Sequence, residues 1–403
     1  MSNTVRTQNV HFVLAPDSLK GSLSAVTACA AMKLGIQRAM GKIPCQISAV
    51  PLADGGEGTV EALLLGTGGE ERIETVSNPL GDPVPAKWGV LQNGQAIIEM
   101  AQASGLTLVP QSDRRPKEAS SYGTGQLIKA ALDVGCRNLL IGIGGSATTD
   151  GGAGALQALG VRLLDADGQN LPQGGFALHR LAKIDLTHLD ARLQDTQITV
   201  LSDVDNPLCG ANGAAYVYGP QKGATPSDVK ELDAALSHFA QVAAATTGKD
   251  FKTAKGAGAA GGMGFGLITF LNARLKAGID VVLEATQIAQ KLETADLVLT
   301  AEGSIDVQTL HGKALSGVAR AASAAKNGKG VPVIAFGGTV QLTSDELQKL
   351  GILVALPLPD APLPLAECIQ RAEELLANAT ERAIRLWLCD REAQAVPSLS
   401  HFI

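Results

Sequence analysis

Residues 139–154 read LLIGIGGSATTDGGAG, and this stretch decides the fold class. A short apolar run typical of a buried strand passes into a glycine-rich loop, and a helix is predicted over Ala153–Leu159. The same order opens the chain, where an apolar run over Val10–Ala15 precedes a helical pattern over Ser22–Met40. Strands that alternate with helices along the chain indicate an α/β fold with a parallel sheet.

The middle of the chain follows a different pattern from its two ends. Three short strand candidates lie within residues 73–99, and Gly-Asp-Pro and Asn-Gly turns separate them, which predicts an antiparallel hairpin. The alternation of strand and helix returns after Ala295. We therefore expect a doubly wound, Rossmann-like parallel-sheet domain over residues 1–75 and 290–403. It is interrupted by a second α/β domain with a mixed sheet over residues 76–289.

The composition fits this fold and excludes several classes of protein. Of the 403 residues 45% are hydrophobic but only 3% are aromatic, so an aliphatic core is expected, which suits helices layered on a parallel sheet. The net charge of −6 provides no basic surface for nucleic acid or an anionic membrane. The chain has no apolar signal segment and no apolar run near the roughly 20 residues of a membrane helix, so a cytoplasmic protein is expected. The six cysteines lack paired spacing, which predicts buried, reduced thiols.

The glycine-rich loop that follows the strand at residues 139–143 is the strongest candidate for an anion site. Glycines let backbone N–H groups approach an anion closely, and hydroxyls add further donors. The loop has neither the Walker A pattern nor the third glycine of GxGxxG, and a tight turn with a helix cap is the alternative. The residues predicted to bind substrate or phosphate here are Gly144, Gly145, Ser146, Thr148, Thr149 and Asp150.

The loop at residues 15–25, APDSLKGSLSA, combines charged and hydroxyl side chains at the start of a helix. Helix capping explains one of its serines but neither Asp17 nor Lys20. A lysine beside a helix start supplies a point charge for phosphate. We therefore predict that Asp17 and Ser18 bind substrate or phosphate and that Lys20 acts in catalysis, with a solvated surface loop as the alternative.

Three further loops, at residues 54–58, 202–206 and 300–313, are rich in acids. Carboxylate oxygens suit a hard metal ion such as Mg²⁺, and the acids assigned to it are Asp54, Glu302 and Asp306. The DxD alternation places Asp203 and Asp205 on the same side of an extended segment, so one of them is predicted to be the general base. The same loops supply Gly55 and Gly56 for substrate binding and Lys313 as a catalytic cation. Taken alone, each loop is equally explained as a turn or a cap.

Acids, lysines and backbone donors dominate these loops, and no Ser–His–Asp triad or catalytic cysteine pattern is present in the sequence. That set of groups favours phosphoryl transfer, which needs positioning, charge neutralisation and Mg²⁺ rather than a protein nucleophile. Two alternatives stay open. An NAD-dependent hydroxy-acid oxidoreductase would use Asp165 or Asp167 for the ribose, and a sensor of sugar phosphates would bind without catalysis.

Six segments in chain order resemble the bacterial type I glycerate kinase family. They are residues 15–25 (APDSLKGSLSA), 54–63 (DGGEGTVEAL), 141–160 (IGIGGSATTDGGAGALQALG), 202–210 (SDVDNPLCG) with 218–224 (YGPQKGA), 256–264 (GAGAAGGMG) and 301–313 (AEGSIDVQTLHGK). The resemblance extends from about residue 13 to residue 338. One departure is Ser304, which stands where the family often has arginine.

The resemblance implies ATP-dependent phosphorylation of D-glycerate to 2-phospho-D-glycerate. It also implies a flavodoxin-like first domain and an active site in the cleft between the two domains. The expected ligands are D-glycerate, ATP and Mg²⁺, with no nucleic-acid or membrane partner. Phosphorylation at the 3-hydroxyl stays open because both hydroxyls lie on one three-carbon unit, and assembly into a homo-oligomer stays open as well.

Overall fold

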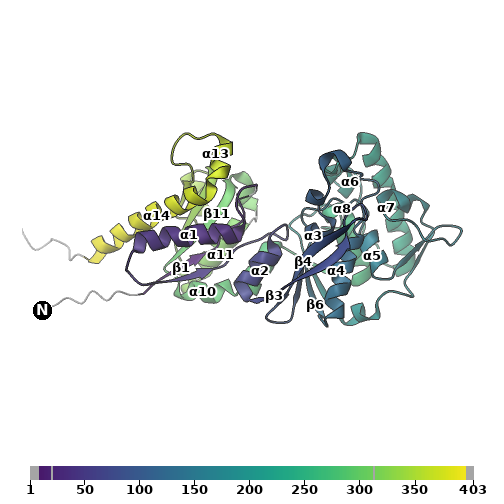
Figure 1. Cartoon of the computed structure of the whole chain (residues 1–403), viewed down its shortest axis with the longest axis horizontal. Helices are drawn as coiled ribbons and strands as arrows, with labels where there is room; N and C mark the ends of the chain where they lie inside the picture. Colours follow the sequence, from purple (N-terminus) through teal and green to yellow (C-terminus); the bar gives the residue numbers. More distant parts are fainter. Residues whose placement is uncertain (1–8, 20, 312–313, 396–403) are drawn as a thin grey trace, which may run out of the picture. The chain divides into compact units, whose positions relative to one another are not determined.

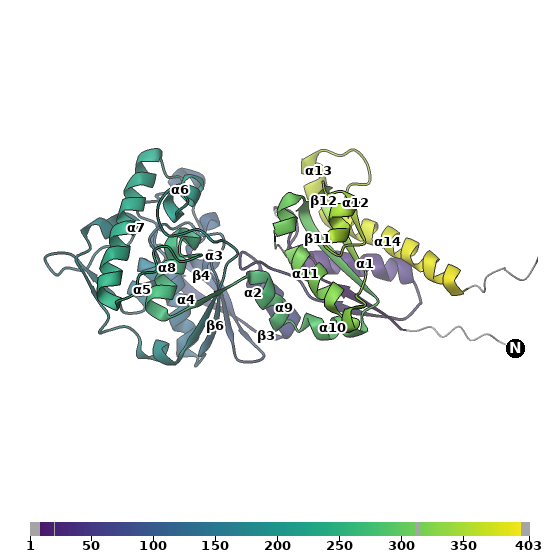
Figure 2. The same cartoon turned by 180° about the vertical axis from the view of Figure 1, so that it is seen from behind.

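The structure is a computed structural model that describes residues 9–19, 21–311 and 314–395. The chain divides into two compact units (Figures 1 and 2). Unit 1 comprises Met1–Ala53 and Val282–Ile403, and unit 2 comprises Asp54–Val281. The sequence pattern placed the first boundary at residues 75/76 and the second at 289/290.

The first boundary lies earlier than expected because the elements that follow Ala53 belong to unit 2. Helix α2 (Thr59–Thr67) packs against strands β4 (Pro83–Leu91) and β5 (Ala96–Glu99). Strand β3 (Gly69–Ser77) pairs with β4 along its whole length. A change of sequence pattern marks where the antiparallel strands begin, but not which core the preceding helix covers.

Unit 1 contains a parallel sheet of five strands in the order β13-β12-β11-β1-β2. The strands are β1 (Val10–Leu14), β2 (Cys45–Ala49), β11 (Leu297–Ile305), β12 (Val333–Val340) and β13 (Val354–Pro357). Counted within the unit, this order is 2-1-3-4-5, the flavodoxin-like arrangement. The predicted flavodoxin-like fold is therefore confirmed.

Helices cover both faces of this sheet. Figure 1 shows α1 (Ala25–Met40) and α14 (Ala372–Ala395) in front of it, packed against each other. Figure 2 shows α10 (Ile288–Thr294) and α11 (Ala314–Ala324) on the opposite face. The remaining helices of unit 1 are α12 (Ser344–Lys349) and α13 (Leu365–Gln370), and α9 (Gly278–Ala285) contains the second boundary between the units.

Local sequence explains how unit 1 begins. All five residues of β1 are buried, as expected of a central parallel strand covered on both faces. Helix α1 starts after Ser24, whose hydroxyl accepts a hydrogen bond from the Thr27 N–H at 3.1 Å and caps the helix. The predicted strand–loop–helix order over residues 10–40 is therefore confirmed.

Unit 2 contains a mixed sheet of six strands in the order β10-β9-β6-β5-β4-β3. The strands not yet introduced are β6 (Asn138–Gly142), β9 (Gln197–Leu201) and β10 (Arg274–Lys276). Strands β5, β6, β9 and β10 run parallel, whereas β3 and β4 form the predicted antiparallel hairpin. A separate two-stranded sheet contains β7 (Arg162–Leu164) and β8 (Lys183–Asp185).

The other helices of unit 2 are α3 (Met100–Ser104), α4 (Tyr122–Asp133), α5 (Ala153–Ala158), α6 (Ala214–Tyr218), α7 (Pro226–Thr247) and α8 (Ala259–Leu271). The sequence analysis missed α7, the longest of these. Its start carries a clear local signal, because Thr225 and Asp228 form a capping box around Pro226.

The glycine-rich stretch at residues 256–266, whose composition suits either a linker or a loop that approaches a ligand, is not a linker. It forms the buried start of α8, where Ala260, Gly261 and Gly262 all have positive φ. A Cβ atom at Gly261 would lie 1.9 Å from the Thr148 carbonyl oxygen. Glycine is therefore needed there so that α8 can approach the loop after β6.

Two further expectations concern the cysteines and membranes. All six cysteines are free thiols, but only Cys29 and Cys136 are buried, so the expectation of buried thiols holds for these two alone. In the part of the chain that the structure describes, no helix is both long and apolar enough to cross a bilayer.

Candidate active site

The first cluster of predicted site residues lies in unit 1, where β1 ends beside the carboxyl half of β11. Asp17 follows β1, and its N–H donates to the Ala301 carbonyl oxygen in β11 at 2.9 Å. The next residue of β11 is Glu302. Asp17 is 9% exposed and Glu302 is 7% exposed, so two buried acidic residues lie on neighbouring segments, one just after β1 and one inside β11. In the 2-1-3-4-5 order this is the point where the strand order reverses, which is where ligands bind in such sheets.

Hydroxyl groups hold the acids of β11 in place. The buried Thr309 hydroxyl donates to Glu302 Oε2 at 3.1 Å and accepts from the Asp306 N–H at 3.2 Å. The Ser304 hydroxyl donates to Asp306 Oδ2 at 2.9 Å and also contacts the Thr339 hydroxyl. Ser304, where the family often has arginine, therefore orients Asp306, one of the three predicted metal ligands.

Lys20 and Lys313, the two predicted catalytic cations, lie outside the described residues. Their roles remain predictions. Ser18 is partly buried, and its N–H donates to Asp17 Oδ1 at 2.7 Å, so these two predicted neighbours are in direct contact.

The second cluster lies in unit 2, at the carboxyl ends of β6 and β9. The Gly144 N–H donates to the Gly55 carbonyl oxygen at 3.1 Å, which joins the loop after β6 to the loop at residues 54–58. Gly55 has a φ of +90°, and a Cβ atom there would lie 2.7 Å from the Cβ of Leu201 at the end of β9. Glycine is required at this contact for both reasons. Three predicted loops, at residues 54–58, 143–152 and 202–206, therefore meet.

The loop after β6 presents polar groups without partners. Among the described residues, nothing accepts a hydrogen bond from the backbone N–H of Gly145, Ser146 or Thr148. The Thr148 and Thr149 hydroxyls are buried and have no partner in the same part of the chain. Buried donors left unpaired are costly, and several N–H donors on a glycine loop suit an anion.

Asp150, predicted to contact substrate or phosphate, has another role in the structure. Its carboxylate is fully buried and accepts hydrogen bonds from the N–H and the hydroxyl of Ser121, both at 2.8 Å. It also accepts from the N–H groups of Gly152 and Gly154. These contacts fix the loop against the starts of α4 and α5, so ligand binding by Asp150 stays a prediction that this geometry does not favour.

The structure separates the two aspartates of the DxD pattern. Asp203 accepts a hydrogen bond from the Gly278 N–H at 2.9 Å. Desolvation raises the pKa of Asp203 to about 6, the nearby Asp54 and Asp280 carboxylates act in the same direction, and the Gly278 hydrogen bond opposes them. Asp205 instead has a side chain that is 77% exposed and pairs with the exposed Lys255 at 3.4 Å. Of the two candidates, Asp203 has the pKa of a general base that works near neutral pH.

The sequence analysis missed two buried charged side chains that contact these loops. Glu99, at the end of β5, is buried, and its Oε1 accepts a hydrogen bond from the Val60 N–H at 2.6 Å, which fixes the start of α2. Desolvation raises the pKa of Glu99. Lys222 is 2% exposed, and its Nζ lies 3.0 Å from the Ser146 hydroxyl. The motif YGPQKGA contains this lysine, but no local pattern links it to a serine 76 residues earlier.

The predicted metal ligands fit Mg²⁺ chemically. Within residues 9–19, 21–311 and 314–395, no three or more His, Cys, Asp or Glu side chains converge as a ready metal cage. Mg²⁺ does not need one, because it keeps several waters and binds through one or two carboxylates together with substrate phosphates. Glu302 and Asp306 offer hard oxygens joined through Thr309. Asp54 lies in unit 2, where one of its oxygens accepts the Gly56 N–H at 3.0 Å.

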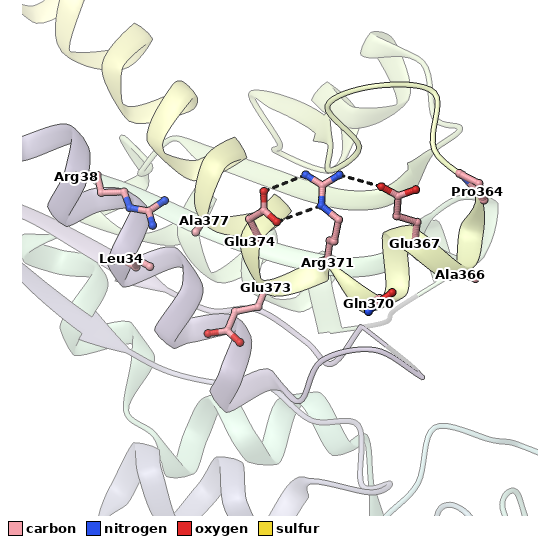
Figure 3. A pocket seen from close by; sticks show the side chains of 10 residues that line it. All are labelled: Leu34, Arg38, Pro364, Ala366, Glu367, Gln370, Arg371, Glu373, Glu374 and Ala377. Atoms are coloured by element: carbon pink, nitrogen blue, oxygen red, sulfur yellow. Dashed lines mark hydrogen bonds and ion pairs between the residues drawn. The ribbon is translucent and has the colours of Figure 1, made fainter.

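A wide pocket elsewhere in unit 1 contains none of the predicted site residues (Figure 3). Helices α1, α13 and α14 line it, and Arg371 crosses it to pair with Glu367 at 3.2 Å and Glu374 at 2.9 Å. Because these carboxylates are neutralised by a neighbour and no strand end contributes to the lining, we do not assign the reaction to this pocket.

Comparison with known proteins shows the family of this chain. Residues 12–388 match the glycerate kinase family. The chain is 47% identical to the glycerate kinase of Bacillus subtilis (strain 168) over 365 residues, which cover 90% of this chain and 94% of the relative. It is 49% identical to the glycerate 2-kinase of Escherichia coli (strain K12) over 334 residues, which cover 83% and 86%. The chain belongs to the glycerate kinase family.

A solved structure agrees with this membership. The crystal structure of a protein from Salmonella typhimurium LT2, assigned as glycerate kinase 2, has a TM-score of 0.84 and 41% identity. The match covers 96% of this chain and all of that chain. The resemblance carried by the six segments is therefore confirmed, over a longer range than the segments themselves span.

The oxidoreductase alternative has no support from the glycerate kinase relatives or from the structure. It required an acid at the end of the next strand of the parallel sheet. Asp165 instead follows β7, which belongs to the separate two-stranded sheet, and its Oδ1 accepts hydrogen bonds from the N–H groups of Asp167 and Gln169 in an exposed turn.

Proposed function

We propose that this protein transfers the γ-phosphoryl group of ATP to the 2-hydroxyl of D-glycerate, giving ADP and 2-phospho-D-glycerate. The observation that carries the proposal is the match to the glycerate kinase family over residues 12–388. The choice of the 2-hydroxyl rests on the Escherichia coli relative, which is a glycerate 2-kinase. A cytoplasmic location is part of the proposal, because ATP is the phosphoryl donor.

Asp203 is the proposed general base. As the hydroxyl oxygen forms its bond to the γ-phosphorus, the bond from that phosphorus to the β–γ bridging oxygen breaks, and ADP leaves with the electron pair. The hydroxyl proton passes to the Asp203 carboxylate, which the Gly278 N–H orients at 2.9 Å. A base with a pKa of about 6 is mostly ionised at neutral pH and accepts this proton readily.

The loop after β6 is the proposed anion site. Backbone N–H groups of Gly145, Ser146 and Thr148, with the Thr148 hydroxyl, would donate to a phosphate or to the glycerate carboxylate. The Gly144 N–H donates to the Gly55 carbonyl oxygen, and a Cβ atom at Gly144 would lie 2.7 Å from the Gly56 Cα, so Gly55 and Gly56 are proposed to act by placing this loop.

In unit 1 Glu302 and Asp306 are the proposed ligands of Mg²⁺, directly or through water, and in unit 2 Asp54 is proposed as a metal-binding acid. When bound, the metal ion neutralises charge on the phosphates during transfer. The Ser304 and Thr309 hydroxyls hold the carboxylates of Asp306 and Glu302 in position. Lys20 and Lys313 are proposed to add positive charge for the transferring group.

The direct test is to incubate the protein with Mg-ATP and D-glycerate and to identify the product by phosphorus NMR. The proposal predicts ADP and the 2-phosphoglycerate signal in equal amounts. The 3-phosphoglycerate signal would correct the position of transfer. ATP consumption that does not depend on glycerate would refute the function.

A further inference from the structure

Lys222 contacts the anion loop, which is the loop after β6 at residues 144–152, but it has no role in the proposed mechanism. It ends a short 3₁₀ helix over Pro220–Lys222, and its Nζ points into unit 2 with only 2% of the residue exposed. Two groups of the loop after β6 contact that nitrogen. They are the Ser146 hydroxyl at 3.0 Å and the Thr148 carbonyl oxygen at 2.5 Å.

The surroundings of Lys222 contain almost no opposite charge. None of the salt bridges among the described residues includes it, and Asp150 is the one charged group that acts on it electrostatically. Asp150 is itself held by Ser121 and by two backbone N–H groups of the loop. A buried ammonium group without a paired carboxylate is costly unless an anion approaches it.

The protonation state of Lys222 decides where the Ser146 hydroxyl hydrogen points. A charged Nζ can only donate, so Ser146 Oγ must accept from it and its own hydrogen is free to donate elsewhere. A neutral Nζ has a lone pair that can accept the Ser146 hydrogen, which then is no longer available to a ligand. Ser146 is 8% exposed, so part of this residue reaches the surface beside the unpaired N–H groups.

We propose that Lys222 is a positioning residue for the anion site: its charged form turns the Ser146 hydroxyl toward an anionic oxygen of the substrate and adds a buried positive charge behind it. This inference rests on the proposed glycerate kinase reaction. That reaction offers two anionic groups with suitable oxygens, the carboxylate of glycerate and a phosphate of ATP. Both have the chemistry that this pair would recognise, and kinetics separate them.

The direction of the pH effect follows from burial. Desolvation lowers the pKa of Lys222 from 10.5 to about 7, against the opposing effect of Asp150. The charged, anion-binding form therefore exists below about pH 7 and is lost as the pH rises through that value. Because kcat/KM reports the groups of the free enzyme, it is expected to fall above pH 7.

The test compares the wild-type protein with Lys222→Met, Ser146→Ala and the double variant, across pH 5.5 to 9. Each single variant is expected to raise the KM of one substrate, glycerate or ATP, about tenfold, which is the loss of one hydrogen bond to a charged group. The same substrate must respond in both variants. The double variant is expected to lose little more than either single one, because the two residues act as a unit. Lys222→Met should also abolish the fall of kcat/KM above pH 7.

A matched control is available in the same unit. Lys252 also donates from Nζ to a serine hydroxyl, that of Ser237 at 2.7 Å, but neither residue belongs to the anion loop. Lys252→Met is expected to leave both KM values and the pH profile unchanged. Thermal unfolding checks the fold of Lys222→Met, which replaces a desolvated lysine with an apolar side chain of similar length.

Unchanged KM values for both substrates in Lys222→Met would overturn the inference, and so would an equal rise in both. The inference would also be contradicted if the fold increase of KM in the double variant equalled the product of the two single increases. These outcomes are distinct from a failure of the proposed function, in which the wild-type protein itself would make no phosphoglycerate.

Discussion

The two clusters of site residues occupy the same kind of place, the carboxyl ends of parallel strands, yet they offer opposite chemistry. In unit 1 two buried acidic residues lie side by side, Asp17 just after β1 and Glu302 in the carboxyl half of β11. In unit 2 the loop after β6 carries unpaired N–H groups in front of a buried lysine, Lys222. The fold therefore determines where polar loops gather, whereas the side chains determine which charge each cluster can accept. The carboxylates beside the end of β1 suit a metal ion, and the loop after β6 suits an anion.

The largest expected effect comes from removing the base beside the anion loop. Asp203→Asn should lower kcat by about 10² to 10⁴, with little change in KM, because a general base acts in the transition state rather than in substrate binding. Steady-state kinetics at pH 7.5 measure this loss. Asp205→Asn is the control, and its exposed ion pair with Lys255 predicts a change of less than about twofold. Equal losses in the two variants would remove the distinction drawn between them.

The next effect tests Glu302 as a ligand of the metal ion. Glu302→Gln keeps the shape of the side chain but removes its charge, so the Mg²⁺ concentration needed for half-maximal activity should rise about 10- to 100-fold. Titration of activity with Mg²⁺ at fixed ATP measures the change. The control is Glu99→Gln, which changes a buried carboxylate of unit 2. Because Glu99 holds the start of α2, this variant should not alter the Mg²⁺ requirement. If only Glu99→Gln alters it, Glu302 has been wrongly assigned as a metal ligand.

A smaller effect tests how tightly α8 must approach the anion loop. Gly261→Ala would place a Cβ atom 1.9 Å from the Thr148 carbonyl oxygen at a φ of +69°, so we expect a loss of stability of about 3 kcal/mol. Gly248→Ala is the control, because Gly248 has a similar φ of +72° but open space around its Cβ position. Its expected cost is about 1 kcal/mol. Urea unfolding measures both, and equal costs would show that the close contact is relieved without strain.

The smallest expected effect is on stability and comes from the raised pKa of Asp203. A carboxyl group whose pKa is higher in the folded state favours folding while it is protonated, so its contribution is lost as the pH rises from about 4 through about 6. Asp203→Asn should therefore raise the melting temperature at pH 8 by a few degrees relative to the wild-type protein. The difference should vanish near pH 4. A lower melting temperature at pH 8 would show that the ionised carboxylate stabilises the fold.

Much of this arrangement was predictable because its signals are local. The apolar runs and glycine turns predicted the parallel strands, the hairpin and most of the polar loops at strand ends. The relation between Lys222 and Ser146 was not predictable, because it depends on the packing of segments 76 residues apart. The role of Asp150 was missed for the same reason, since a loop aspartate and a buried loop-organising aspartate have the same local sequence. Strand β10 was not predicted because it has only three residues. The Gly278 N–H, which lies just after this strand and orients Asp203, was therefore not predicted either.

One pH profile tests most directly whether Lys222 supports anion binding and Asp203 acts as the base. We measure kcat/KM for glycerate and for ATP from pH 5 to 9 in the wild-type protein, Asp203→Asn and Lys222→Met. The expected wild-type profile is a bell that rises near pH 6 as Asp203 ionises and falls near pH 7 as Lys222 loses its proton. Each variant should lose only its own limb. A profile whose two limbs survive in both variants would contradict the assignment of these residues.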